Sequence, residues 1–87
     1  MQQPYKGDSN SDQLQQVAQS GDQWAAERAN YAIQVHGAVG AGQLSASEAK
    51  EILQDMINTQ HLQEQANADH VKAALFFGIM ELISLYG

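Results

Sequence analysis

The sequence predicts an all-α protein, and three observations lead to this prediction. Ala and Gln each occur thirteen times among the 87 residues, and both favour helices. The single proline, Pro4, lies where it interrupts no long segment. Apolar residues recur at spacings of three and four, as they do on one face of a helix. We therefore expect an antiparallel helical hairpin with a helix over 12–36, a glycine-rich turn over 37–44 and a long helix over 46–86 that could break near 67–69.

Residues 1–11 are polar and carry no apolar period, so we expect them to form a flexible N-terminal arm before a single helical domain over 12–87. Ser11 or Asp12 can cap the first helix. Two stripes follow along that helix. The larger one has the 3–4 spacing of a helix–helix seam and contains Leu14, Val17, Gly21, Trp24, Arg28, Tyr31, Val35 and Ala38. The smaller one, Ala18, Ala25, Ala29 and Ala32, would let another helix approach closely.

The second helical region begins with the strongest local signal in the chain. Ser45 and Glu48 have the spacing of a capping box, in which each side chain accepts a hydrogen bond from the backbone of the other. Apolar residues between 49 and 57 then give an amphipathic helix. Residues 58–70 are polar, but no Gly or Pro falls between Ser45 and Phe77, so we favour a continuous helix there.

Residues 71–87 are the most hydrophobic part of the chain, and they decide the expected assembly. A helix over 12–36 would be roughly 37 Å long, and one over 46–86 roughly 61 Å, so a simple hairpin leaves this end uncovered. Either a third helix folds back after Asn67 or another chain supplies the cover. We favour the second arrangement, in a homo-oligomer or with other subunits of a larger assembly, because exposed apolar surface of this size is rare on a monomer. The expected interface residues are Trp24, Arg28, Tyr31, Leu75, Phe76, Phe77, Ile79, Met80, Leu82, Ile83 and Tyr86.

Charge and composition disfavour several classes of function. Ten acidic residues against four basic ones give a net charge of -6, which disfavours binding to nucleic acid or to an anionic membrane surface. The absence of cysteine excludes thiolate catalysis and cysteine-ligated metals. We expect a soluble structural or assembly protein rather than an enzyme. Two alternatives stay open: a small acidic inhibitor of a host protein, and a membrane-associated hairpin, although 71–87 is shorter than the roughly 20 apolar residues that span a bilayer.

No catalytic, cofactor-binding or metal-binding residue is predicted. His61 and Glu64 share a helix face, and Asp69 and His70 follow, so a carboxylate–imidazole site between copies is conceivable. No ligand motif is complete there, however, and no cofactor is expected. For Trp24 we expect a packing role, and for Arg28 an ion pair with Glu27, Asp55 or an acid of another copy.

The segment Gly42-Gln-Leu-Ser-Ala-Ser-Glu-Ala-Lys-Glu-Ile-Leu-Gln-Asp55 combines a short turn with a capped acidic helix. It resembles segments of the small helical structural proteins of tailed bacteriophages. The resemblance covers fourteen of the 87 residues and implies a virion component that would be found in the host cytoplasm during assembly. It carries over no functional residue.

Overall fold

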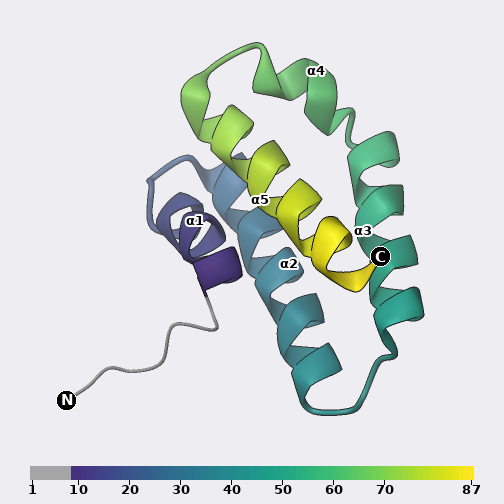
Figure 1. Cartoon of the computed structure of the whole chain (residues 1–87). Coiled ribbons are helices and arrows are strands. Elements are labelled where there is room, and N and C mark those ends of the chain that lie inside the picture. Colours follow the sequence, from purple (N-terminus) through teal and green to yellow (C-terminus); the bar gives the residue numbers. More distant parts are fainter. Residues whose placement is uncertain (1–8) are drawn as a thin grey trace, which may run out of the picture.

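The computed structural model describes residues 9–87, which form five helices (Figure 1). Four of them pack around the fifth, α5. The predicted all-α class is confirmed. α5 lies in front of α2, between α1 and α3, with α4 across one end, and it contacts all four other helices. The bounds of the helices are α1 Ser9–Ala18, α2 Gln23–Gly40, α3 Ala46–Thr59, α4 Leu62–Ala66 and α5 His70–Tyr86.

The single helix expected over 12–36 is two helices, because the chain turns at Gly21. The φ of Gly21 is +91°, a left-handed conformation that a side chain would disfavour. Asp22 then caps α2 by accepting a hydrogen bond from the Ala25 amide at 3.1 Å. α2 also runs to Gly40, so the first residues of the expected 37–44 turn are helical.

The expected arm over 1–11 overlaps α1, which begins at Ser9. The rest of that expectation, residues 1–8, lies outside the described residues.

The continuous helix expected over 46–86 is interrupted twice. The first interruption follows α3, where His61 adopts φ +53°, a left-handed conformation outside the helix. The second lies at residues 67–69, near the break that the sequence allowed, and Asp69 caps α5 there. At the start of α3 the predicted capping box is confirmed: the Glu48 amide donates to Ser45 Oγ at 3.0 Å, and the Ser45 amide donates to Glu48 Oε1 at 2.9 Å.

These interruptions let the chain fold back on itself, so the favoured expectation that another chain must cover residues 71–87 is wrong for one side of that segment. That side lies inside the core of this chain. The core joins residues from all five helices: Leu14, Val17, Ala25, Ala29, Ala32, Val35, Ala49, Leu53, Met56, Leu62, Leu75, Ile79, Leu82 and Ile83. None of the described helices is both long enough and apolar enough to cross a membrane.

Small residues set how closely the helices approach. Ala25, Ala29 and Ala32 are fully buried, as expected of a stripe that another helix covers. Gly78 has the same role in α5, where a Cβ atom would lie 2.8 Å from both Cγ and Cδ2 of Leu14. Because Leu14 is itself fully buried, its side chain has little freedom to move aside. The docking of α1 on α5 therefore depends on a residue without a side chain at position 78.

The end of α5 is attached to α2 by a polar contact. The Tyr86 hydroxyl and His36 Nδ1 share a hydrogen bond, and their ring centroids lie 5.9 Å apart. Both side chains are half-buried, so the bond is partly shielded from water. The bond fixes the last turn of α5 against α2.

Substitution of Gly78 and Gly37 by alanine should change stability in opposite directions. Gly37→Ala meets nothing within 4 Å and should stabilise the fold by up to about 1 kcal/mol through helix propensity. Gly78→Ala has the same propensity gain, but overpacking against Leu14 costs about 1–3 kcal/mol. Urea unfolding measures both variants. Equal stabilisation by the two substitutions would show that α1 does not pack against α5 at this point.

Asp69 should make stability depend on pH in the acid range. The Lys72 amide donates to Asp69 Oδ1 at 2.8 Å, and this bond, followed by the charge of Lys72, holds the pKa of Asp69 below its usual 3.8. A lowered pKa contributes stability that is present above 3.8 and is lost as the pH falls through the folded-state value. Unfolding of the wild type and of Asp69→Asn should therefore differ most in slope below pH 3.8. Parallel pH profiles would contradict this role of Asp69.

Candidate interaction surface

The expected interface residues divide into a buried and an accessible group. Leu75, Ile79 and Leu82 are fully buried, and Ile83 is 8% exposed. These four lie in the core of the chain itself and are not part of its surface. Trp24, Arg28, Phe76 and Tyr86 are half-buried. Tyr31, Phe77 and Met80 are exposed.

The exposed residues of α5 form one continuous strip, which we call the α5 face. Its large apolar side chains are Phe77, Met80 and Leu85, with exposed fractions of 55%, 42% and 53%. They lie three to five residues apart and so fall on one side of the helix, opposite Leu75, Ile79 and Leu82. The α5 face consists of the exposed residues His70, Phe77, Met80, Glu81, Ser84 and Leu85 and the half-buried Ala73 and Ala74 beside them.

A groove beside the α5 face extends its apolar surface towards α3. Its volume is about 430 Å³, and it is lined by apolar residues with amide side chains among them: Gln54, Ile57, Asn58, Gln63, Phe76, Met80 and Ile83. The rings of Phe76 and Phe77 meet edge to face, with centroids 5.3 Å apart. Phe76 in the groove and Phe77 on the strip therefore form one connected aromatic surface.

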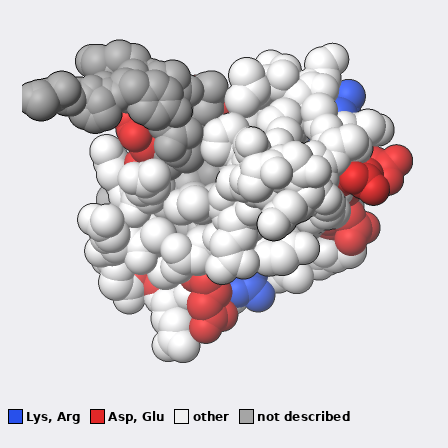
Figure 2. Space-filling model, turned by 90° about the horizontal axis from the view of Figure 1, so that it is seen from below, with Lys and Arg blue, Asp and Glu red and all other residues white. Residues whose placement is uncertain are grey.

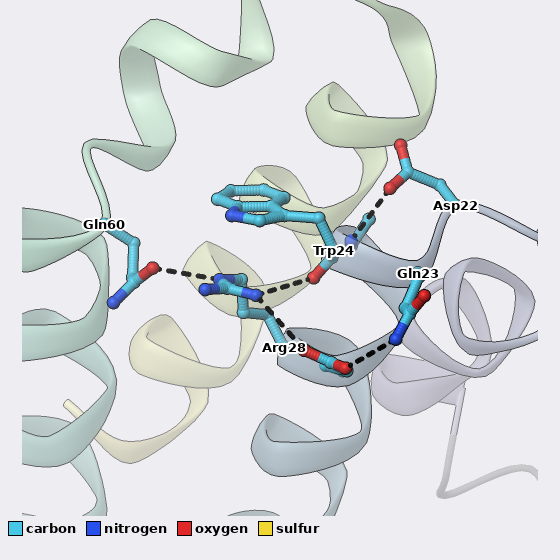
Figure 3. Close-up of polar contacts among 7 residues, drawn as sticks. Asp22, Gln23, Trp24, Arg28 and Gln60 are labelled. Atoms are coloured by element: carbon cyan, nitrogen blue, oxygen red, sulfur yellow. Dashed lines mark hydrogen bonds and ion pairs between the residues drawn. The ribbon is translucent and has the colours of Figure 1, made fainter.

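A second polar and aromatic cluster lies where α2, α3 and α5 meet (Figure 3). The Arg28 guanidinium stacks on the Trp24 indole, 4.3 Å from the ring centroid. Its Nε donates to Gln60 Oε1 at 2.9 Å, and Nη1 donates to the Trp24 carbonyl oxygen at 3.0 Å. Lys72 of α5 also lies over the indole, with Nζ 5.6 Å from the centroid. Cations from two helices thus lie close to the Trp24 ring.

The geometry of this cluster indicates a structural role. The Arg28 side chain is 24% exposed, and its bond to Gln60 connects α2 to the end of α3. The expected pair with Glu27 is present, with 3.7 Å between Arg28 Nη1 and Glu27 Oε1. The Glu27 side chain is 63% exposed, so this pair contributes little to stability. Gln60, which the sequence did not indicate, is the better placed partner.

Tyr31 lies at a different cleft, between α2 and α3. The cleft has a volume of about 360 Å³ and is lined by Glu27, Arg28, Tyr31, Ile52, Asp55, Met56, Thr59 and Gln60. On α3, the residues that line this cleft and those that line the α5 groove point in nearly opposite directions. Tyr31 and Phe77, which were expected at one interface, therefore lie on two separate surfaces.

The conceivable metal ligands are not brought together. In residues 9–87, no three His, Asp or Glu side chains lie close enough to hold a metal ion. Asp69 is occupied as a helix cap and pairs with Lys72 Nζ at 3.7 Å. His61 lies in the left-handed turn before α4, which separates it from His70 at the start of α5.

No family model, curated protein or solved structure matches this chain. The candidate surfaces are therefore defined by geometry alone.

Leu85 is the exposed apolar residue that the sequence reasoning missed, and a signal for it was present. Glu81 is the only acidic residue in 70–87, and an unpaired acid usually faces water. Leu85 follows Glu81 by four residues and Phe77 precedes it by four, so both share its side of the helix. Taking Glu81 as the marker of the solvent side would have placed Leu75, Ile79 and Leu82 in the core.

Substitution of Arg28 should loosen the cluster and report through Trp24, the only tryptophan of the chain. Arg28→Ala loses a cation–π contact and two hydrogen bonds and should cost about 1–3 kcal/mol. Arg28→Lys keeps the charge but loses the Nε donor to Gln60, so it should fall between the wild type and the alanine variant. Denaturant unfolding followed by Trp24 fluorescence measures both. Wild-type stability of Arg28→Ala would mean that the cluster does not hold the helices together.

Proposed function

We propose that this chain is a non-enzymatic structural or assembly protein that associates with other protein subunits through the α5 face. One observation carries the proposal: three of the four large apolar side chains exposed on the described residues, Phe77, Met80 and Leu85, lie on this one helix. Scattered exposed apolar residues are ordinary, but a contiguous apolar patch is typical of a protein interface. The α5 groove enlarges this patch.

The composition of the patch also supports association. Aromatic residues and methionine are enriched at interface centres, and charged residues are depleted there. The α5 face has Phe77 near its middle, Met80 beside it and Glu81 as its only acid. Burial of each large apolar side chain contributes about 1.5–3 kcal/mol if it becomes complete, against which the entropy lost on association must be set. Three such residues and the groove give a surface on which association is favourable.

Within this proposal, a minor component of a tailed-bacteriophage particle is the setting to which residues 42–55 point. This segment forms the turn before α3 and the capped first turns of that helix. It contributes no residue to the α5 face, and only its Gln54 lines the groove. The resemblance is the only support for this setting, and the proposed association does not depend on it.

A second candidate is an acidic regulator that binds a basic surface of another protein. The cleft between α2 and α3 favours it, because the exposed side chains of Glu27, Tyr31 and Asp55 surround that cleft. Binding there would weaken steeply with added salt, since screening reduces the attraction between exposed charges. Association through the apolar α5 face would be much less sensitive to salt.

Polar substitution of the α5 face should abolish association without unfolding the chain. Phe77→Gln combined with Leu85→Gln removes two exposed apolar side chains and leaves the core unchanged. We expect the wild type to sediment above 9.5 kDa, alone or within its complex, and the double variant to sediment at 9.5 kDa with an unchanged circular dichroism spectrum.

The matched control is Tyr31→Gln, which removes a side chain of similar exposure (47%) from the other surface. It should leave association unchanged. Loss of association in the control but not in the double variant would assign the function to the α2–α3 cleft instead. A double variant that keeps every interaction of the wild type would overturn the proposal.

A further inference from the structure

We infer that the occupant of the α5 face is a second copy of this chain, bound with the two α5 helices antiparallel and related by a two-fold axis at Phe77. The inference rests on the proposed function, since it names the partner for the same surface. Its support comes from how the two halves of the α5 face fit each other.

Apart from His70 and Ser84, the side chains of the α5 face are small before Phe77 and larger after it. Ala73 and Ala74 lie in the N-terminal half, and Met80 and Leu85 lie in the C-terminal half. A two-fold axis at Phe77 places residues at equal distances before and after it opposite each other. Ala73, seven residues before Met80, shares its α3 flank, so Met80 of one copy, three residues after the axis, then lies near Ala73 of the other, four residues before it. A large side chain meets a small one twice, which is the condition for interdigitated helix packing.

Leu85 meets a matching hollow. It lies eight residues, about 12 Å, after Phe77, and the axis places it close to His70 of the other copy, about 10 Å before Phe77. A hollow of about 230 Å³ lies at that end of α5, between α5 and α1, lined by Gln13, Gln16, Val17, Ser20, His70, Val71 and Ala74.

Leu85 and this hollow also lie on the same flank of the α5 face. Ala74, Gly78 and Leu85 follow one another at spacings of four and seven along the helix and so share one side of it. Gly78 on this side packs against Leu14 of α1. A two-fold axis in the plane of the contact reverses the helix direction but keeps the α1 flank over the α1 flank. Leu85 of each copy therefore projects towards the hollow of the other.

Charge favours the same arrangement. The antiparallel pairing brings Glu81 of one copy, about 6 Å after the axis, beside His70 of the other copy, whose imidazole can hydrogen-bond a carboxylate. A parallel pairing would place Glu81 against Glu81, which is unfavourable. Asp69, near the edge of the contact, is already paired with Lys72 of its own chain. The antiparallel arrangement thus gives Glu81 a hydrogen-bonding imidazole, whereas the parallel one brings two carboxylates together.

Of the acidic residues that the structure describes, only Glu81 belongs to the α5 face, so a second copy meets few like charges there. Nine of the ten acidic residues precede His70 in the sequence. The end of the molecule that Figure 2 shows from below is also mostly uncharged, with acidic groups around its edges. A contact made by one helix face and its flanking hollows belongs to the small class of interfaces. We therefore expect a dimer that dissociates on dilution.

Engineered cysteines test this geometry cleanly, because the natural chain has none. Ser84 and His70 are exposed and lie seven residues after and before Phe77, so the two-fold axis places Ser84 of one copy opposite His70 of the other. Under a mild thiol oxidant, a mixture of Ser84→Cys and His70→Cys chains should form a disulfide-linked heterodimer. Each variant alone should form linked dimers only at the background rate. Gln34→Cys, on the exposed side of α2, sets that background.

We expect the mixed pair to cross-link at least about tenfold faster than the background, because a formed interface raises the effective concentration of the two thiols. Rapid linkage of either single variant alone would indicate parallel helices and overturn the inference. Linkage of the mixture at the background rate would exclude this dimer. A wild-type spectrum of circular dichroism for both variants shows that the fold is retained.

The failure of this inference and that of the proposed function are distinguishable. If the cross-linking pattern is wrong but the Phe77→Gln and Leu85→Gln double variant still loses its association, the α5 face binds something other than an antiparallel second copy. If the double variant also keeps all its interactions, the α5 face is not an association surface.

Discussion

The rest of this structure depends on burial of one side of α5. Leu75, Ile79 and Leu82 have no exposed surface, and together with Gly78 they form the side of α5 that the other helices cover. Burial of this side requires the chain to turn at Gly21, at His61 and at residues 67–69, because straight helices of the expected lengths would leave α5 uncovered. Each interruption thus loses a few helical hydrogen bonds but lets apolar side chains become buried. Apolar burial contributes more to the stability of the fold than those hydrogen bonds do.

The sequence predicted what local chemistry determines. The all-α class, the capping box at Ser45 and the buried alanine stripe of α2 follow from short-range spacing, and each is present. The break at residues 67–69 was only an alternative to the continuous helix that the sequence favoured. The break at His61 was not predictable in this way, since a left-handed histidine has no local marker. It is the covering of α5 by distant segments that imposes this turn. The Arg28–Gln60 bond was missed for the same reason, because its partners are 32 residues apart.

The expected interface was wrong for the residues of α5 that lie in the core, and for those on its open side it stays a prediction. Treating residues 71–87 as uncovered on both sides placed Leu75, Ile79 and Leu82 with Phe77 and Met80, although a helix wrapped by its own chain has only one open side. That open side is chemically distinct. It carries Glu81, three large apolar side chains and two alanines, a pattern that is polar enough to leave in water and apolar enough to bind protein.

The most direct test of the account follows α5 residue by residue as the protein is diluted. Nuclear magnetic resonance can resolve the side-chain signals of Phe77, Met80 and Leu85 separately from those of Leu75, Ile79 and Leu82. The account predicts that the first three change with protein concentration while the second three do not, because only the exposed side of α5 enters an interface. Signals of Phe77, Met80 and Leu85 that stay constant, or core signals that change with them, would contradict it.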